Sequence, residues 1–140
     1  MIILDTNVVS EALQLRPSAS VAAWLDAQIP SELHTTVTTE AELRSGVALL
    51  PQGKRRRDLL IAVNAVLSRH FAERIIPFDS AAATAFADIG EHRRTIGRPI
   101  SQFDAQIAAI CKARGATLAT RNIADFADIG LKLINPWSAT

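Results

Sequence analysis

The chain has 140 residues, 49% of them hydrophobic and 21% charged, so it fits one folded domain over residues 1–140 and excludes a disordered segment. A net charge of +1 excludes the bulk positive charge of many nucleic-acid-binding proteins, and one cysteine excludes a disulfide framework. No apolar run is long enough to cross a bilayer, and no signal peptide is recognisable. We therefore expect a cytoplasmic protein without a membrane partner.

Short apolar runs alternate with longer helical patterns along the chain. We expect strands at Ile2–Asp5, Leu33–Val37, Arg74–Pro77, Thr117–Thr120 and Lys132–Ile134. We expect helices at Val8–Leu15, Ser20–Gln28, Glu40–Leu49, Lys54–His70, Ala81–Thr95 and Gln102–Ala113, with a short one at Ile123–Ala127. Such alternation predicts an α/β fold in three layers, a mostly parallel sheet between helices. Right-handed crossovers then place every helix N-terminus at the edge where the strands end.

The first strand ends at a carboxylate. Ile2, Ile3 and Leu4 show no polar alternation, which is typical of a strand buried on both faces, and Asp5 follows at the point where the chain leaves the core. Ligands of open parallel sheets bind beyond the carboxyl ends of the strands. Asp5 is therefore a candidate for metal binding or proton transfer, although capping of the next helix explains it equally well.

Three further segments place an acid in the expected first turn of a helix, with the spacing of a capping box. These pairs are Thr39 with Glu42, Ser101 with Asp104, and Asn122 with Asp125. Taken singly, each acid is explained by free amides and by the helix dipole. Taken together with Asp5, they converge on one crevice if the first and fourth strands are neighbours.

Carboxylates gathered in one crevice repel one another unless a cation neutralises them. Hard oxygen ligands suit Mg²⁺ or Mn²⁺ better than Zn²⁺. His34, His70 and His92 lack the spacing of metal ligands and are predicted to be surface or packing residues. The sequence therefore points to an oxygen-ligated divalent metal at the strand ends.

Four segments, in this order along the chain, resemble the acidic motifs of PIN-domain ribonucleases, and most closely those of VapC and FitB toxins. They are Ile3-Leu-Asp-Thr-Asn7, Thr39-Glu-Ala-Glu-Leu-Arg-Ser-Gly46, Asp104-Ala-Gln-Ile-Ala108 and Leu118-Ala-Thr-Arg-Asn-Ile-Ala-Asp-Phe126. The resemblance implies a PIN-like domain with a five-stranded sheet in the order 3-2-1-4-5. It places the strand before Asp79 at the sheet edge, so Asp79 is expected to be a helix cap.

The resemblance makes Asp5, Glu42 and Asp104 the metal-binding carboxylates. A fourth position is open, because Asn122 stands where some relatives have an acid and Asp125 is the nearest carboxylate. Thr6 and Thr120 are expected to orient the carboxylates. Glu40 is expected to point to a different side of its helix from Glu42.

The activity implied by the resemblance is metal-dependent hydrolysis of RNA phosphodiester bonds, inhibited by a cognate antitoxin of the VapB or FitA type. A homodimer is also implied, and the segment Leu59–Leu67, apolar almost all round, is either its interface or core. Residues that could grip RNA are Arg44, Lys54, Arg55, Arg56, Arg57 and Arg121, although a solvated helix end explains the basic run equally well.

Two other interpretations compete with the nuclease. A catalytically silent PIN-like module that binds RNA or protein is favoured by the missing acid at Asn122. A phosphotransferase with Asp5 as nucleophile is disfavoured, because Asn7 replaces the second acid of that motif and no phosphate-binding glycine loop is present. The remaining basic group, which is Arg93, Arg94 and Arg98, is predicted to be a solvated face, and the five phenylalanines to be mostly core.

Overall fold

The computed structural model describes residues 1–138, so the last two residues of the predicted domain lie outside the described residues. Five strands form one sheet in the order β3-β2-β1-β4-β5, and every neighbouring pair is parallel. The strands are β1 (Ile2–Leu4), β2 (Leu33–Thr36), β3 (Ile75–Ile76), β4 (Thr117–Ala119) and β5 (Leu133–Ile134). The predicted strand order is confirmed, and β1 and β4 are neighbours at the centre of the sheet.

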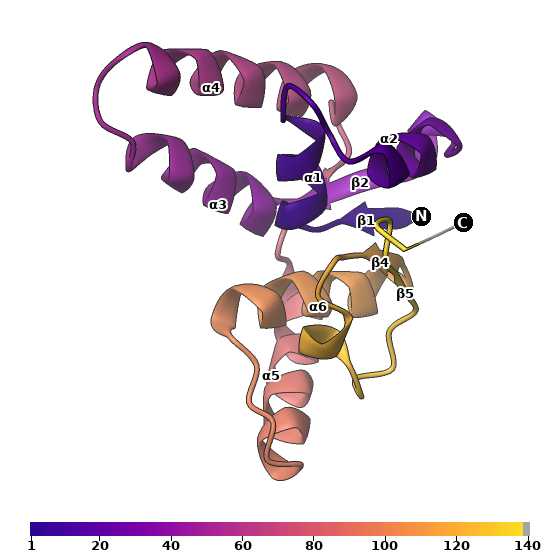
Figure 1. The fold of residues 1–140 in the computed structure, drawn as a ribbon. Helices are drawn as coiled ribbons and strands as arrows, with labels where there is room; N and C mark the ends of the chain where they lie inside the picture. Colours follow the sequence, from indigo (N-terminus) through magenta and orange to yellow (C-terminus); the bar gives the residue numbers. More distant parts are fainter. Residues whose placement is uncertain (139–140) are drawn as a thin grey trace.

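Helices cover both faces of this sheet (Figure 1). The six α-helices are α1 (Thr6–Ala12), α2 (Ala19–Asp26), α3 (Val37–Ala48), α4 (Lys54–Ala65), α5 (Ser80–Thr95) and α6 (Gln102–Arg114). Figure 1 shows α3 and α4 as a hairpin on the same side as α1 and α2, whereas α5 and α6 lie on the opposite side. The three-layer prediction is therefore confirmed. Within residues 1–138, no helix is long and apolar enough to cross a membrane.

The central strand separates two hydrophobic cores. Ile3 packs with the residues of α5, α6 and β4, whereas Leu4 packs with those of α1, α3 and α4. Both side chains are at most 2% exposed, which confirms that β1 is buried on both faces. Successive residues of a strand point to opposite faces, so this three-residue strand joins the two halves of the molecule. Asp5 follows at the boundary between the cores.

Several predicted boundaries differ from the structure. Helix α3 begins at Val37 and not at Glu40, and the predicted helix Lys54–His70 changes to a π-helix over Val66–His70. The phenylalanines are only partly core, since Phe103 is 53% and Phe78 is 37% exposed. Segment Leu59–Leu67 is buried on one side only: Val63 and Leu67 are core residues, whereas Leu60 and Ile61 are exposed.

Candidate active site

Asp5 lies at the end of β1 and is only 4% exposed. Its backbone N–H donates to Ala119 O at 3.1 Å, and its Oδ1 accepts from the N–H of Val8 at 3.1 Å. Asp5 is therefore the N-cap of α1, as one of the two interpretations of the sequence expected. Capping occupies one carboxylate oxygen and leaves lone pairs for other partners.

Burial raises the pKa of Asp5 to about 6, and the negative charge of Asp104 contributes to the increase. Hydrogen bonds from Thr120, Val8 and Asn7 act in the opposite direction without cancelling it. Cys111 is also buried, and its own burial raises the pKa of its thiol to about 12, with the charge of Asp5 as the second cause. No positive charge is among the causes of the raised pKa of Asp5, and a cation bound beside Asp5 would favour its ionised form.

Asp104 lies in the first turn of α6, and its N–H donates to the Ser101 hydroxyl at 3.2 Å. The capping arrangement predicted for this pair is confirmed. Burial raises the pKa of Asp104 and the negative charge of Asp125 adds to it, whereas the Ser101 hydrogen bond and the charge of Arg93 lower it. Asp104 therefore interacts electrostatically with both Asp5 and Asp125, which shows that the topology brings these acids together.

Glu42 reaches the site by a different route from the one predicted. The N-cap of α3 is Thr36, whose hydroxyl accepts from the N–H of Thr39 at 3.1 Å, so Thr39 does not cap the helix. Glu42 consequently lies beyond the first turn, where it cannot close a capping box. Its Oε1 instead accepts a hydrogen bond of 2.7 Å from the hydroxyl of Thr6, the residue after Asp5. This contact holds Glu42 of α3 against the start of α1.

The segment after β4 carries the two alternative residues for the fourth position. Asn122 precedes the short 3₁₀ helix η3 (Ile123–Phe126) but makes no capping bond with its side chain, so the third predicted capping box is wrong. Thr120 is fully buried, and its hydroxyl accepts from the N–H of Asn122 at 3.0 Å. The same side chain bonds to Asp5. Thr120 thus links the buried acid to the exposed turn that holds Asn122 and Asp125.

The donor chemistry of this edge fits a hard divalent cation. Asp5 and Asp104 supply carboxylate oxygens, and the raised pKa of each shows that a nearby positive charge would be favourable. In residues 1–138, no three His, Cys, Asp or Glu side chains stand close enough to enclose a metal by themselves. Mg²⁺ does not need such an enclosure, because one or two carboxylates together with water and substrate phosphates complete its coordination.

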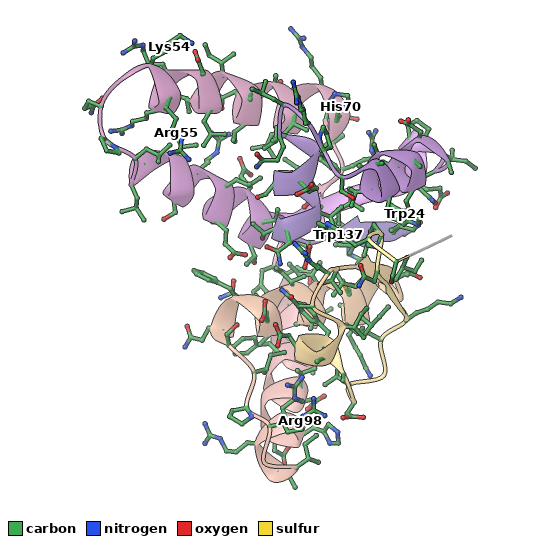
Figure 2. All side chains as sticks on the ribbon, viewed as in Figure 1. Trp24, Lys54, Arg55, His70, Arg98 and Trp137 are labelled. Carbon is green, nitrogen blue, oxygen red and sulfur yellow. The ribbon has the colours of Figure 1, made fainter. Side chains whose placement is uncertain are left out.

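Two of the basic residues that were predicted to contact RNA are paired with acids outside the site. Arg44 bonds to Glu40 at 2.9 Å and to Asn64 at 2.9 Å, so Glu40 points away from Glu42 as predicted. Lys54 pairs with Asp58 at 2.6 Å. Figure 2 shows Lys54 and Arg55 at the tip of the α3–α4 hairpin, and Arg98 at the far end of α5. The guanidinium of Arg121 lies 5.1 Å above the ring of Trp137, which packs against the core.

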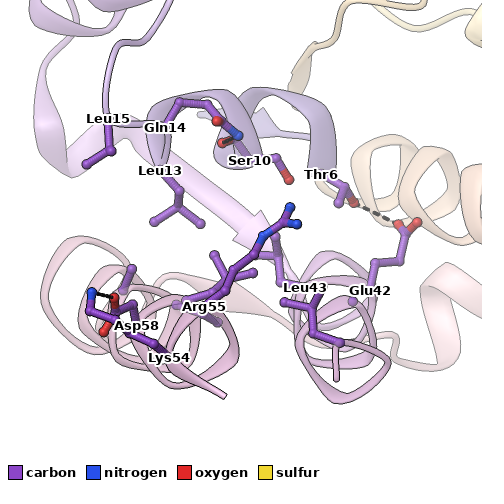
Figure 3. Close-up of a pocket in the computed structure, with 15 residues that line it drawn as sticks. Thr6, Ser10, Leu13, Gln14, Leu15, Glu42, Leu43, Lys54, Arg55 and Asp58 are labelled. Atoms are coloured by element: carbon purple, nitrogen blue, oxygen red, sulfur yellow. Dashed lines mark hydrogen bonds and ion pairs between the residues drawn. The ribbon is translucent and has the colours of Figure 1, made fainter. Parts of the chain in front are cut away.

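A groove of about 860 Å³ runs between α1, α3 and α4, and Thr6 and Glu42 are among the residues that line it. Apolar side chains line much of it, among them Leu13, Leu43 and Val63. In Figure 3, Arg55 crosses the groove from α4 toward α1, and the bonded pair of Thr6 and Glu42 stands at one end. Any chain that fills this groove therefore lies next to Glu42.

Arg93 is a residue that reasoning from the sequence missed, because its charge placed it on a solvated face. The side chain is only 4% exposed. Ala82, Ile89 and Arg93 are the buried residues of α5, and their spacings of seven and four residues are those of one helix face. That periodicity was the available signal. By contrast, Asp79 caps α5 by accepting from Ala82 N–H at 2.9 Å, as predicted.

The chain is similar to known proteins over nearly its whole length. The family model described as "PIN domain" matches residues 2–131. Two relatives are 41% identical over 137 residues, which is 98% of this chain: VapC ribonuclease Y4jK of Sinorhizobium fredii, covered to 98%, and toxin FitB of Neisseria gonorrhoeae, covered to 99%. The crystal structure of FitAcB from Neisseria gonorrhoeae superimposes with a TM-score of 0.92 at 40% identity, over 99% of this chain and 100% of that one.

A five-stranded parallel sheet, with Asp5 at the end of its central strand and Asp104 in the first turn of α6, defines an α/β protein with a candidate nuclease-type metal site. This chain belongs to the PIN-domain family, and its similarity to VapC and FitB spans nearly the whole sequence. The resemblance inferred from the four motifs is confirmed.

Proposed function

We propose that this protein is a divalent-metal-dependent endoribonuclease that acts as a toxin and is inhibited by a cognate antitoxin. The observation that carries the proposal is the placement of two acids: Asp5 is buried at the end of the central strand β1, and Asp104 lies in the first turn of α6, where its charge contributes to the raised pKa of Asp5. The names of the relatives, a ribonuclease and a toxin, support it. We further propose that the metal is Mg²⁺ or Mn²⁺ and that the protein acts in the cytoplasm.

Each residue of the site has a separate task in this proposal. Asp5 and Asp104 would hold a divalent cation, which would supply an activated water and stabilise charge on the leaving oxygen. Glu42, fixed by Thr6, would contribute a further oxygen. Asn122 or Asp125 completes the rim. No side chain acts as a nucleophile, so the protein contributes position and electrostatics.

The direct test is cleavage of single-stranded RNA by the purified chain with Mg²⁺ or Mn²⁺, with EDTA as the control. We expect cleavage with metal and none with EDTA. RNA that is bound but never cut with either metal would contradict the nuclease and favour the silent binding module. The silent module is supported by Asn122, which is exposed, forms no side-chain capping bond and supplies no carboxylate.

The Thr6 contact gives a prediction about catalysis. Thr6→Val removes the hydroxyl that holds Glu42 while nearly preserving the side-chain volume. We expect a loss of about 10–100-fold in the cleavage rate, the usual cost of losing a partner that orients a metal ligand. Thr6→Ser retains the donor and should cleave at close to the wild-type rate. Equal rates for the valine and serine variants would show that Glu42 does not need this bond.

RNA contacts are proposed at the basic residues nearest the groove. Arg55 reaches into it, and Lys54 stands at its entrance (Figure 3). Arg56, Arg57 and Arg121 extend positive charge along the surface, whereas Arg44 is engaged by Glu40. Phosphate contacts of this kind supply affinity without reading sequence.

We propose that the antitoxin places a segment in the groove between α1, α3 and α4. The apolar lining suits a hydrophobic segment, and the groove ends at Glu42, so an occupant shields the acids from RNA. The crystal structure of FitAcB, a complex that contains the FitB relative, supports a partner of this type. We also propose that two copies of the chain contact each other through the exposed Leu60 and Ile61 of α4.

Gly46 provides a way to separate inhibition from catalysis. It lines the groove from α3, and a Cβ atom added there meets no atom within 4 Å. Gly46→Phe should fill the groove and weaken antitoxin binding by at least about tenfold, and the cleavage rate of the free variant, measured in parallel, corrects for any loss of activity. The measurement is growth inhibition during co-expression with the product of the adjacent gene, alongside cleavage in vitro.

Gly90 of α5 is the matched control for this prediction. It is also a helical glycine at which an added Cβ atom meets nothing within 4 Å, but it lies outside the groove. Gly90→Phe should remain fully inhibited by the antitoxin. If Gly46→Phe is inhibited as well as the Gly90 variant, the antitoxin does not occupy this groove.

A further inference from the structure

Arg93 is a buried cation whose partners are all uncharged. Its Nε donates to Arg98 O at 2.6 Å, and its Nη1 donates to Asp125 O at 2.8 Å and to Ala127 O at 3.3 Å. In residues 1–138 no carboxylate pairs with it. Burying a guanidinium is costly unless hydrogen bonds compensate, and an apolar residue would fill the same face of α5 without that cost. The charge therefore calls for an explanation beyond packing.

The carbonyls that Arg93 holds belong to the turn at the rim of the active site. Asp125 lies in η3, and Ala127 is the C-cap of that helix. The beginning of the same turn is held by the Thr120 hydroxyl, which accepts from Asn122 N–H at 3.0 Å. The turn is thus anchored at its start by a residue that also bonds to Asp5, and at its end by Arg93.

A second arginine reinforces this clamp from the surface. Arg98 donates from Nη1 to Asp128 Oδ2 at 2.7 Å and from Nη2 to Ala124 O at 3.3 Å. The carbonyl of Arg98 is itself an acceptor of Arg93, so the buried guanidinium joins α5, the outer arginine and η3. Asp128 has a positive φ of 64°, which costs free energy in a residue other than glycine. The two arginines hold the chain in that conformation.

The guanidinium of Arg93 combines a fixed geometry with a positive charge. Its Nε and Nη1 donate to three carbonyl oxygens at once. The planar fork fixes a geometry that a flexible ammonium does not reproduce. Position and charge are therefore separate contributions, and different substitutions distinguish them.

We propose that Arg93 is a positioning residue of the nuclease site, which holds the turn with Asn122 and Asp125 at the rim of that site. The inference rests on the proposed endoribonuclease function for its catalytic consequence. Helix α5 therefore takes part in assembling the site through Arg93, although none of the carboxylates assigned to the site lies on α5. RNA and metal are not contacted by Arg93.

The test compares Arg93→Lys, which keeps a charge but loses the fork, with Arg93→Gln, which loses both. We expect kcat for RNA cleavage to fall about 10–100-fold in each variant while KM for RNA is unchanged, because RNA is gripped elsewhere. Mn²⁺ titration should show weaker binding, and amide hydrogen exchange should become faster over residues 123–127. Arg94→Lys, an exposed neighbour in the same turn of α5, is the control and should match the wild type.

The outcomes separate the proposal from a merely structural role. Faster exchange in the turn with wild-type kcat and Mn²⁺ affinity overturns it, as does a folded lysine variant that is unchanged in every measurement. If the Arg93 variants do not fold, Arg98→Gln removes only the bonds to Asp128 and Ala124. This variant should show smaller changes of the same kind in kcat, Mn²⁺ affinity and amide exchange. Wild-type exchange over residues 123–127 in Arg98→Gln would contradict the proposal. If the wild type cuts no RNA, the proposed function fails, whereas weaker Mn²⁺ binding by Arg93→Lys still supports the positioning role.

Discussion

Asp5→Asn should abolish RNA cleavage and growth inhibition, with a loss well beyond the factor of about 100 that the loss of an outer partner costs. The substitution removes the negative charge from the most buried acid of the site. Asn accepts a hydrogen bond as an N-cap nearly as well as Asp, so the bond from Val8 N–H and the start of α1 are preserved. The loss therefore reports on metal binding. The measurement is cleavage with Mg²⁺ or Mn²⁺, with circular dichroism to verify the fold.

Asp79→Asn is the matched control. Asp79 is also an N-cap aspartate, and it accepts from Ala82 N–H at 2.9 Å at the start of α5. It follows the edge strand β3, away from the central strands β1 and β4. We expect this variant to cleave RNA at the wild-type rate. Cleavage by Asp5→Asn at a rate similar to that of Asp79→Asn would contradict the assignment of Asp5 as a metal ligand.

The sheet and the position of Asp5 were predictable because they depend on strong, local signals. Ile2, Ile3 and Leu4 are uninterrupted apolar residues, and a parallel sheet with right-handed crossovers fixes which edge carries the acid that follows. The strand order came from the resemblance to PIN domains and is confirmed by the pairing of β1 with β2 and β4. The neighbouring β1 and β4 then explain why Asp5 and Asp104 interact.

The start of α3 was not predictable from the same reasoning. Thr35, Thr36, Thr38 and Thr39 surround Val37, and such a β-branched run fits the end of a strand as well as the start of a helix. Any of these hydroxyls is a chemically reasonable cap, and only tertiary packing selects Thr36. The error displaced Glu42 by about one helical turn, although its hydrogen bond from Thr6 still joins it to the residue that follows Asp5.

Arg93 shows a different limit of reasoning from sequence. Its charge predicts exposure, because arginine is rarely fully buried without a partner. Here the partners are backbone carbonyls from residues 98, 125 and 127, which no residue type in the sequence reveals. Contacts made by main-chain atoms, such as those of Arg93, could therefore be found only in the structure. The open choice between Asn122 and Asp125 falls in the turn that these bonds hold.

The stability of the metal-free protein should decrease as the pH rises through the range from about 4 to 6. The pKa of Asp5 is raised from 3.8 to about 6 in the folded chain, mainly by burial. The folded state therefore binds more protons than the unfolded state in this range, and the free energy of unfolding falls with increasing pH. Integrated over the shift, the contribution of Asp5 is about 3 kcal/mol, fully present below about pH 3.8 and lost as the pH rises through about 6.

Urea denaturation in EDTA at pH 5 and pH 7.5, for wild type and Asp5→Asn, isolates this contribution. Asn does not titrate, so the variant should lose less stability between the two pH values and should exceed the wild type at pH 7.5. Mg²⁺ should stabilise the wild type at pH 7.5, by about 2.7 kcal/mol at a concentration 100 times its Kd, because it binds only the folded site. The variant should respond less. Identical pH dependence of the two proteins would show that the buried acid carries no uncompensated charge, and the need for a cation at Asp5 would then lose its physical basis.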